Sequence, residues 1–94
     1  MTLNDYLSSP GVVAKAFADQ IGVPPPLLSQ YRTGKEHGGR QIPDDRCPAI
    51  EFESGGYVTC EEQRPDLVWV RVKDRSWPHP QGRPLVDHST KKAA

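Results

Sequence analysis

Apolar side chains recur every three or four residues over most of the first two thirds of the chain, the spacing of helices that bury one face. Thr2 can cap a first short helix that carries Leu3, Tyr6 and Leu7 on one side. A second helix is expected to end at Gly22, because glycine is favoured just past a helix end. Its apolar positions are Val12, Val13, Ala16, Phe17 and Ile21.

Three further short helices are predicted before Pro65. The segment 26–33 places apolar and polar residues on opposite sides and ends at Gly34. The next helix is expected to start at Pro43, with the acidic pair 44–45 in its first turn, where the helix dipole favours negative charge. A brief fifth helix begins at Thr59, which forms a capping box with Glu62.

The pattern changes to alternation after Leu67. Val68, Val70 and Val72 lie opposite Trp69 and Arg71, which predicts a short strand or extended arm. No regular structure is expected after Trp77, so the strand has no predicted partner within the chain. It should therefore lie against the helices or pair with its copy in a second subunit.

The stretch 14–33 fits a helix-turn-helix, in which the second of two helices joined by a short turn enters the DNA major groove. Ala18 is small enough for the helices to approach, and Gly22 can adopt the positive φ of the turn. The residues expected to pack the pair are Phe17, Ile21, Val23, Leu28 and Tyr31. An ordinary helical hairpin shares the apolar spacing but does not require this order together with an outer polar face.

Two longer runs carry a family resemblance. "AKAFADQIGVPPPLLSQYRTGK" and "IPDDRCPAIEFESGGYVTCEEQRPDLVW" resemble the YdaS/Cro-like regulators of prophages, within the phage Cro and repressor superfamily. The second run is the more specific, because "P-x-x-R-C-x-x-I-E" and "G-G-x-V-T-C-E-x-x-R-P-D" recur in that family. The resemblance implies a sequence-specific DNA-binding regulator, usually dimeric on a palindromic operator. Some relatives are described as antitoxins, so a toxin partner is an alternative that the resemblance leaves open.

Pro24, Pro25 and Pro26 precede the third helix. Proline is tolerated in a first helical turn, because its missing N–H has no intrahelical acceptor there. A residue before proline is biased toward extended conformations, so the helix is expected to begin near Pro26. Relatives usually carry Ser or Thr at the place of Pro24, and the lost cap should cost about 0.5–2 kcal/mol. The three prolines also offer no N–H to a DNA phosphate.

Base reading is expected from Ser29 and Gln30, because glutamine can bond adenine N6 and N7 together, while Pro25, Pro26 or Leu27 could touch a thymine methyl. The residues expected to position the helix on phosphates are Lys15, Gln20, Arg32, Thr33, Lys35 and Arg40. For any one of these exposed side chains, simple solvation is the alternative interpretation.

The formal net charge of the 94 residues is zero, but the charges are unevenly placed. Residues 12–42 carry four basic and two acidic side chains, whereas residues 43–66 carry two basic and seven acidic ones. The acidic stretch should therefore face away from DNA. From residue 67 onward six basic side chains oppose two acidic ones, which suits either a solvated tail or contact with a polyanion.

Catalytic and metal chemistry find no support in the residue pattern. Cys47 and Cys60 are expected to be small interior residues, because neither has a second cysteine or a histidine at ligand spacing. Trp69 and Trp77 are expected to anchor the tail by packing. No signal peptide or membrane-spanning run is seen, so a cytoplasmic protein with reduced thiols is expected.

The sequence as a whole predicts an all-α fold of five short helices with a helix-turn-helix, plus a C-terminal extended arm. Residues 1–66 would form the DNA-binding domain, and residues 67–94 the arm and tail. The expected function is that of a Cro-like repressor that binds a double-stranded operator as a homodimer with helix 26–33, without cofactor, metal or enzymatic activity. The alternative is an antitoxin-type interaction module that neutralises a toxin.

Overall fold

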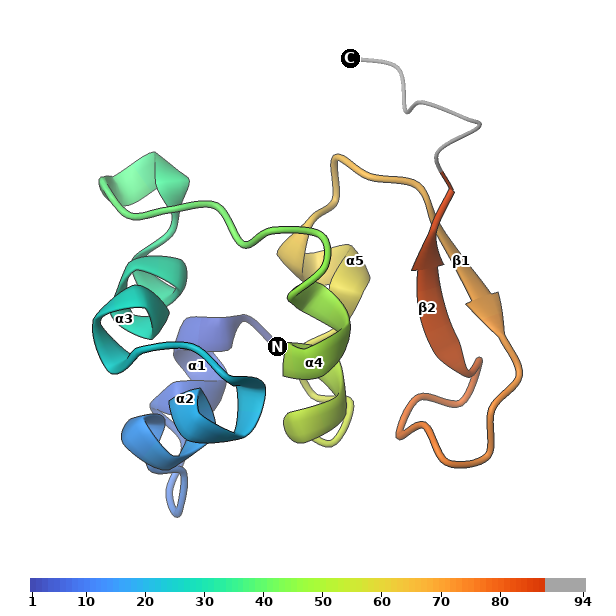
Figure 1. Ribbon diagram of the computed structural model, residues 1–94, viewed down its shortest axis with the longest axis horizontal. Coiled ribbons are helices and arrows are strands. Elements are labelled where there is room, and N and C mark those ends of the chain that lie inside the picture. The colour runs from blue at the N-terminus through green and yellow to red at the C-terminus, as the bar shows by residue number, and fades with distance from the viewer. Residues whose placement is uncertain (88–94) are drawn as a thin grey trace.

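The structure is a computed structural model that describes residues 1–87. Within them the chain forms short helices on one side and a two-stranded sheet on the other (Figure 1). The elements are α1 (Leu3–Leu7), α2 (Ala14–Ile21), α3 (Pro25–Thr33), the 3-10 helix η1 (Lys35–His37), α4 (Cys47–Glu53), α5 (Cys60–Gln63), β1 (Trp69–Val72) and β2 (Arg83–Val86). The end of the expected tail, 88–94, lies outside the described residues.

The two helix ends predicted at Thr2 and Gly22 are confirmed, whereas Val13 lies before α2 and is 63% exposed. The Thr2 side chain accepts a hydrogen bond from the backbone N–H of Asp5 at 3.1 Å and so caps α1. Gly22 ends α2 in the left-handed region at φ 75°. The capping box of α5 is also present between Thr59 and Glu62. The buried core is continuous across α1, α2, α3, α4 and α5.

Helix α3 begins at Pro25, one residue earlier than expected. Pro24 is extended, with φ −63° and ψ 144°, and its carbonyl accepts hydrogen bonds from the N–H groups of Leu27 and Leu28. These two bonds close the first turn over Pro25 and outweigh the bias that the following proline imposes. As expected, no side chain caps the helix at Pro24. After α3, the residues Lys35–His37 form the short 3-10 helix η1.

Helix α4 begins at Cys47, and the expected start at Pro43 is wrong. A helix from Pro43 would place Pro48 in its interior, where proline has no N–H for the fourth carbonyl back. The chain instead makes a turn, in which the Arg46 N–H bonds the Pro43 carbonyl at 3.0 Å. Pro48 then falls at the second position of α4, where it costs no hydrogen bond. Asp44 and Asp45 therefore lie before the helix and not in its first turn.

The fold is mostly helical but not all-α, because β1 pairs with β2 in an antiparallel sheet. The expectation of no regular structure after Trp77 is therefore wrong. Four residues containing Pro84 give a weak strand signal, since proline is excluded from central strands. Gly82 closes the hairpin with a φ of 96°, and a Cβ there would lie 1.9 Å from the Val72 carbonyl oxygen. Only glycine allows this approach.

The hairpin packs on the helices with its Trp69 and Arg71 face, while Val70 and Val72 are exposed. The indole N–H of Trp69 donates to the Arg64 carbonyl at 3.0 Å. Trp77, in the loop between the strands, packs on Phe52 with ring centroids 5.0 Å apart. The prediction that both tryptophans anchor this part of the chain by packing is confirmed. The predicted arm is thus a docked hairpin.

Candidate nucleic-acid interface

Helix α3 has one buried side and one open side. Leu28 and Tyr31 are buried in the core, where α3 contacts both α2 and α1. The opposite side consists of Pro25, Pro26, Ser29, Gln30 and Thr33, all of which are exposed. Leu27 is half-buried between these sides. The structure thus brings the two expected base-reading residues, Ser29 and Gln30, onto an accessible helical surface.

The connection from α2 to α3 consists of Gly22, Val23 and Pro24. Val23 is buried, and its N–H bonds the Ala18 carbonyl at 3.0 Å. Ala18 itself has no exposed surface, which is consistent with its predicted role at the point where the helices approach. The residues predicted to pack the two helices together, namely Phe17, Ile21, Val23, Leu28 and Tyr31, are all buried. A rigid core therefore supports the open side of α3.

A loop fastens the C-terminal end of α3. The backbone carbonyl of Gln30 accepts hydrogen bonds from the N–H groups of Gly34 and Arg40, each at 3.1 Å. Gly39 approaches so closely that a Cβ on it would lie 2.3 Å from the same carbonyl oxygen. Residue 39 must therefore be glycine, because there is no room for a side chain at this position. This clamp was not predicted from the sequence, although the paired glycines 38–39 indicate a close approach of the backbone.

Arg32 is held by α1. Its Nε donates to Asn4 Oδ1 at 3.0 Å, and its Nη2 donates to the Ser8 hydroxyl at 3.1 Å. Two of its three nitrogens are thus used within the chain, and the side chain ties α3 to α1. A phosphate contact by Arg32 stays a prediction, and it would have to involve Nη1 or a rearranged side chain.

The other predicted phosphate contacts are all exposed. Lys15 and Gln20 lie on α2, Lys35 begins η1, and Arg40 follows in the loop. In Figure 1, η1 follows directly after α3, and α2 lies beside α3. Thr33 is exposed as well, and its hydroxyl donates to the Ser29 carbonyl at 2.9 Å. Its oxygen keeps lone pairs that can accept.

A second polar network is organised around a buried carboxylate on α4. Glu51 of α4 has no exposed surface, and Arg71 of β1 donates to its two oxygens, both at 2.6 Å. The Trp77 indole N–H donates to Oε2 at 2.6 Å, and the Cys60 N–H donates to Oε1 at 3.0 Å. Four donors thus satisfy the carboxylate and fix the hairpin to α4. This network was not predicted from the sequence, because Glu51 and Arg71 lie 20 positions apart.

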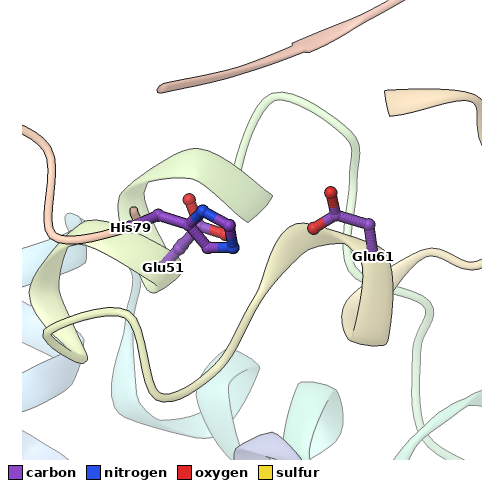
Figure 2. A group of neighbouring side chains, drawn as sticks. All are labelled: Glu51, Glu61 and His79. Carbon is purple, nitrogen blue, oxygen red and sulfur yellow. The ribbon is translucent and has the colours of Figure 1, made fainter. Parts of the chain in front are cut away.

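Glu51, Glu61 and His79 form the one group of potential metal ligands found among residues 1–87, with ligand atoms within 4.8 Å of one another (Figure 2). The guanidinium of Arg71 donates to both carboxylates, at 2.6 Å to Glu51 and 2.5 Å to Glu61. The positive charge between the two carboxylates is therefore the Arg71 guanidinium, which explains why the carboxylates lie close together. We assign no metal to it.

The buried carboxylate predicts an acid-dependent stability. Burial alone would raise the pKa of Glu51, but hydrogen bonds from Arg71, Trp77 and Cys60 outweigh burial, so its pKa lies below the ordinary 4.5. Glu51 thus stabilises the fold above pH 4.5, and this contribution is lost as the pH falls through the lower folded-state pKa. Urea unfolding from pH 7 to 3 should show a steeper loss of stability in the native chain than in Glu51→Gln. If the stability of the two proteins fell equally with pH, Glu51 would not be the source of the acid dependence.

Cys47 and Cys60 are free thiols with no exposed surface, which confirms their interior placement. Burial raises the pKa of the Cys47 thiol to about 12 and raises that of Cys60 further above its ordinary value. Both groups are therefore protonated, packed side chains. No helix of the described part is long and apolar enough to cross a bilayer.

Comparison with known proteins gives one informative match. No family model matches the chain, and no solved structure does. A curated protein of Escherichia coli strain K12, "Putative transcriptional regulator YdaS", is 48% identical over 58 residues. The match covers 62% of this chain and 55% of the relative, so the chain spans about half the length of the curated protein it matches. The predicted resemblance to YdaS is thus supported over part of the chain, and the match favours a transcriptional regulator.

Proposed function

We propose that this protein is a sequence-specific DNA-binding transcriptional regulator that reads an operator through the major groove with α3. The observation that carries the proposal is the division of α3 into a buried side and an open side, with Ser29 and Gln30 on the open one. The partial match to a protein named as a transcriptional regulator supports the same function.

The α2–α3 unit has the parts that such a role needs. A helix reads bases precisely only if its orientation is fixed, and α3 is fixed at three places. Its core side is buried, Arg32 bonds α1, and the 34–40 loop closes on the Gln30 carbonyl. The Gln30 side chain is exposed and carries both a donor and an acceptor, as adenine N7 and N6 require.

Phosphate binding in this proposal comes from side chains around α3. Three successive prolines remove the N–H groups that a helix start normally offers to an anion. The exposed side chains of α2, η1 and the following loop would hold the two backbones of the groove, namely Lys15, Gln20, Lys35 and Arg40. The acidic network of Glu51 and Glu61 belongs to α4 and α5, on the side of the hairpin (Figure 1).

Gln30→Ala tests base reading. Double-stranded oligonucleotides would first be selected from a random library with the native protein. The substitution is expected to weaken binding to the selected sequence by about 1–3 kcal/mol while leaving binding to unrelated DNA unchanged, because only the base contact is lost. Fluorescence anisotropy at fixed salt measures both affinities. Gln81→Ala, an exposed glutamine of the hairpin loop, is the matched control. Equal losses in the two variants would remove Gln30 from the readout.

Lys35→Gln tests the phosphate contacts. Loss of one positive charge at the end of α3 should weaken binding to all DNA sequences alike and reduce the slope of log affinity against log salt by about one unit. Lys73→Gln removes another exposed lysine, from the loop between the strands, and should leave the slope unchanged. The affinity of each variant for DNA would be measured from 50 to 300 mM salt. A slope that Lys35→Gln does not alter would exclude this lysine from the interface.

A further inference from the structure

A pocket with a volume of about 370 Å³ lies between α1, α3 and α5. Its base is apolar, because the buried side chains of Leu3, Ile42 and Val58 line it. Its walls are polar, and they come from two different helices. Pockets of about 300 Å³ or more are large enough to enclose a small molecule, so the side chains that face this one indicate which ligand it could bind.

The wall formed by α3 offers hydrogen-bond donors. Tyr31 is 7% exposed, and its hydroxyl bonds no other group within residues 1–87. Gln63 Oε1 is the one fully enclosed side-chain oxygen or nitrogen without a partner in this part of the chain, so the Tyr31 hydroxyl is accessible from the pocket. Arg32 uses Nε and Nη2 for Asn4 and Ser8, which leaves Nη1 as a second donor with a positive charge.

The wall formed by α5 offers acceptors. Gln63 donates from Nε2 to two backbone carbonyls, at 3.2 and 3.3 Å, which fixes its carboxamide, and its Oε1 is buried without a partner. Glu62 also lines the pocket, and its carboxylate accepts a hydrogen bond from the ammonium group of Met1, so an ammonium fits against it. An unpaired carbonyl oxygen beside a carboxylate favours a positively charged donor.

We propose that this pocket binds a free α-amino acid with an apolar side chain. The carboxylate of the ligand accepts hydrogen bonds from Arg32 Nη1 and from the Tyr31 hydroxyl on the α3 wall. Its ammonium donates to Glu62 on the α5 wall, where it shares the carboxylate with Met1 or replaces it. The apolar side chain of the ligand covers the base of the pocket.

The opposite character of the two walls argues against ligands with a single charge. A purely anionic ligand would meet the Glu62 carboxylate, and a purely cationic one would meet the Arg32 guanidinium. A small zwitterion with an apolar part matches both walls and the base. The pocket belongs to the free protein, so this proposal does not depend on the proposed binding of DNA.

Analogues of one amino acid test the two walls separately in the native chain. Isotope-labelled protein without DNA would be titrated with L-phenylalanine and followed by the backbone amide resonances. Residues around the pocket should shift with a dissociation constant of about 1 mM or lower. Phenylalaninamide lacks the carboxylate and phenylpropionate lacks the ammonium, so each should bind at least about tenfold more weakly. No binding, shifts only outside the pocket, or equal affinities for the three compounds would each overturn the proposal.

Glu62→Gln tests the contact with the ammonium. Glutamine keeps the side-chain acceptor of the capping box but removes the negative charge. The variant should bind L-phenylalanine about tenfold more weakly and phenylpropionate as the native chain does, because phenylpropionate has no ammonium. Glu61→Gln is the matched control, since Glu61 is the exposed neighbour on α5 and is not among the described residues that line the pocket. Equal losses in the two variants would contradict the assignment.

Tyr31→Phe tests the contact with the carboxylate, because it removes only the hydroxyl. It should weaken L-phenylalanine and phenylpropionate about three- to tenfold and leave phenylalaninamide unchanged. Tyr57→Phe, at a tyrosine that is 64% exposed, is the control and should alter none of the three affinities. Thermal unfolding of each variant shows whether the fold is kept. A Tyr31→Phe variant that binds all three compounds like the native chain would exclude the hydroxyl. If DNA binding fails while the titrations succeed, the pocket stands without the proposed function.

Discussion

Arg71→Met is expected to lower the free energy of unfolding by about 3–5 kcal/mol, because it leaves the Glu51 carboxylate buried without its cation. Methionine fills a similar volume but cannot donate a hydrogen bond. Glu51 has no exposed surface and the Arg71 side chain is 7% exposed, so water cannot replace the lost partner. For a domain whose total stability is about 5–15 kcal/mol, this is a large fraction. Urea unfolding followed by tryptophan fluorescence measures the change.

Glu61→Gln is the matched control, since Glu61 bonds the same guanidinium from the exposed side, where its side chain is 46% exposed. Its loss should cost less than about 1 kcal/mol, because solvent screens exposed ion pairs. Similar losses in Arg71→Met and Glu61→Gln would show that burial of Glu51 does not decide the energy. That result would also weaken the account of how the hairpin is attached.

Leu28→Ala is expected to lower the free energy of unfolding by about 2–5 kcal/mol and to reduce DNA affinity with it. Leu28 is 2% exposed and fixes α3 in the core, so truncation leaves a cavity directly under the open side of the helix. Leu27→Ala, at the neighbouring half-buried position, should cost clearly less. Chemical denaturation and anisotropy on the same variants measure both effects.

The Leu27 and Leu28 variants also test how α3 is oriented. If Leu27→Ala proves the more costly for stability, the buried and open sides of α3 are assigned wrongly. The proposed contacts of Ser29 and Gln30 would then fail together with the stability prediction, since all of them depend on the same rotation of the helix about its axis.

Local signals predicted the helical part well. The Thr2 cap, the capping box at Thr59 and the stop at Gly22 each depend on residues no more than four positions apart, and all three are confirmed. The start of α4 was misplaced because Pro43 was read as a first-turn proline, while the stricter limit came from Pro48 inside the same segment.

Contacts between distant residues could not be read from the same patterns. Glu51 lies 20 positions before Arg71, and nothing in the spacing of either residue indicates that they meet. The partner strand of β1 was missed because proline is typical of loops. Pro84 is compatible with β2 because its nitrogen faces away from β1, so no hydrogen bond of the ladder is lost. The open side of α3 was predicted correctly for Ser29 and Gln30, since helical periodicity alone separates them from Leu28 and Tyr31. Helical periodicity did not predict that the Arg32 side chain is used within the chain, because its partners Asn4 and Ser8 belong to α1 and its C-terminal end.

The hydrogen bonds around Glu51 affect when the helical part becomes fully folded during synthesis. When α4 has left the ribosome but residue 71 has not, the Glu51 carboxylate lacks the two hydrogen bonds from Arg71. The hydrogen bond from Trp77 forms later still. The helical part should therefore gain its full resistance to proteolysis only after about residue 77 has left the ribosome. For the same reason, cutting the chain at the predicted boundary after residue 66 should destabilise the helices, because Glu51 would lose its bonds from Arg71 and Trp77.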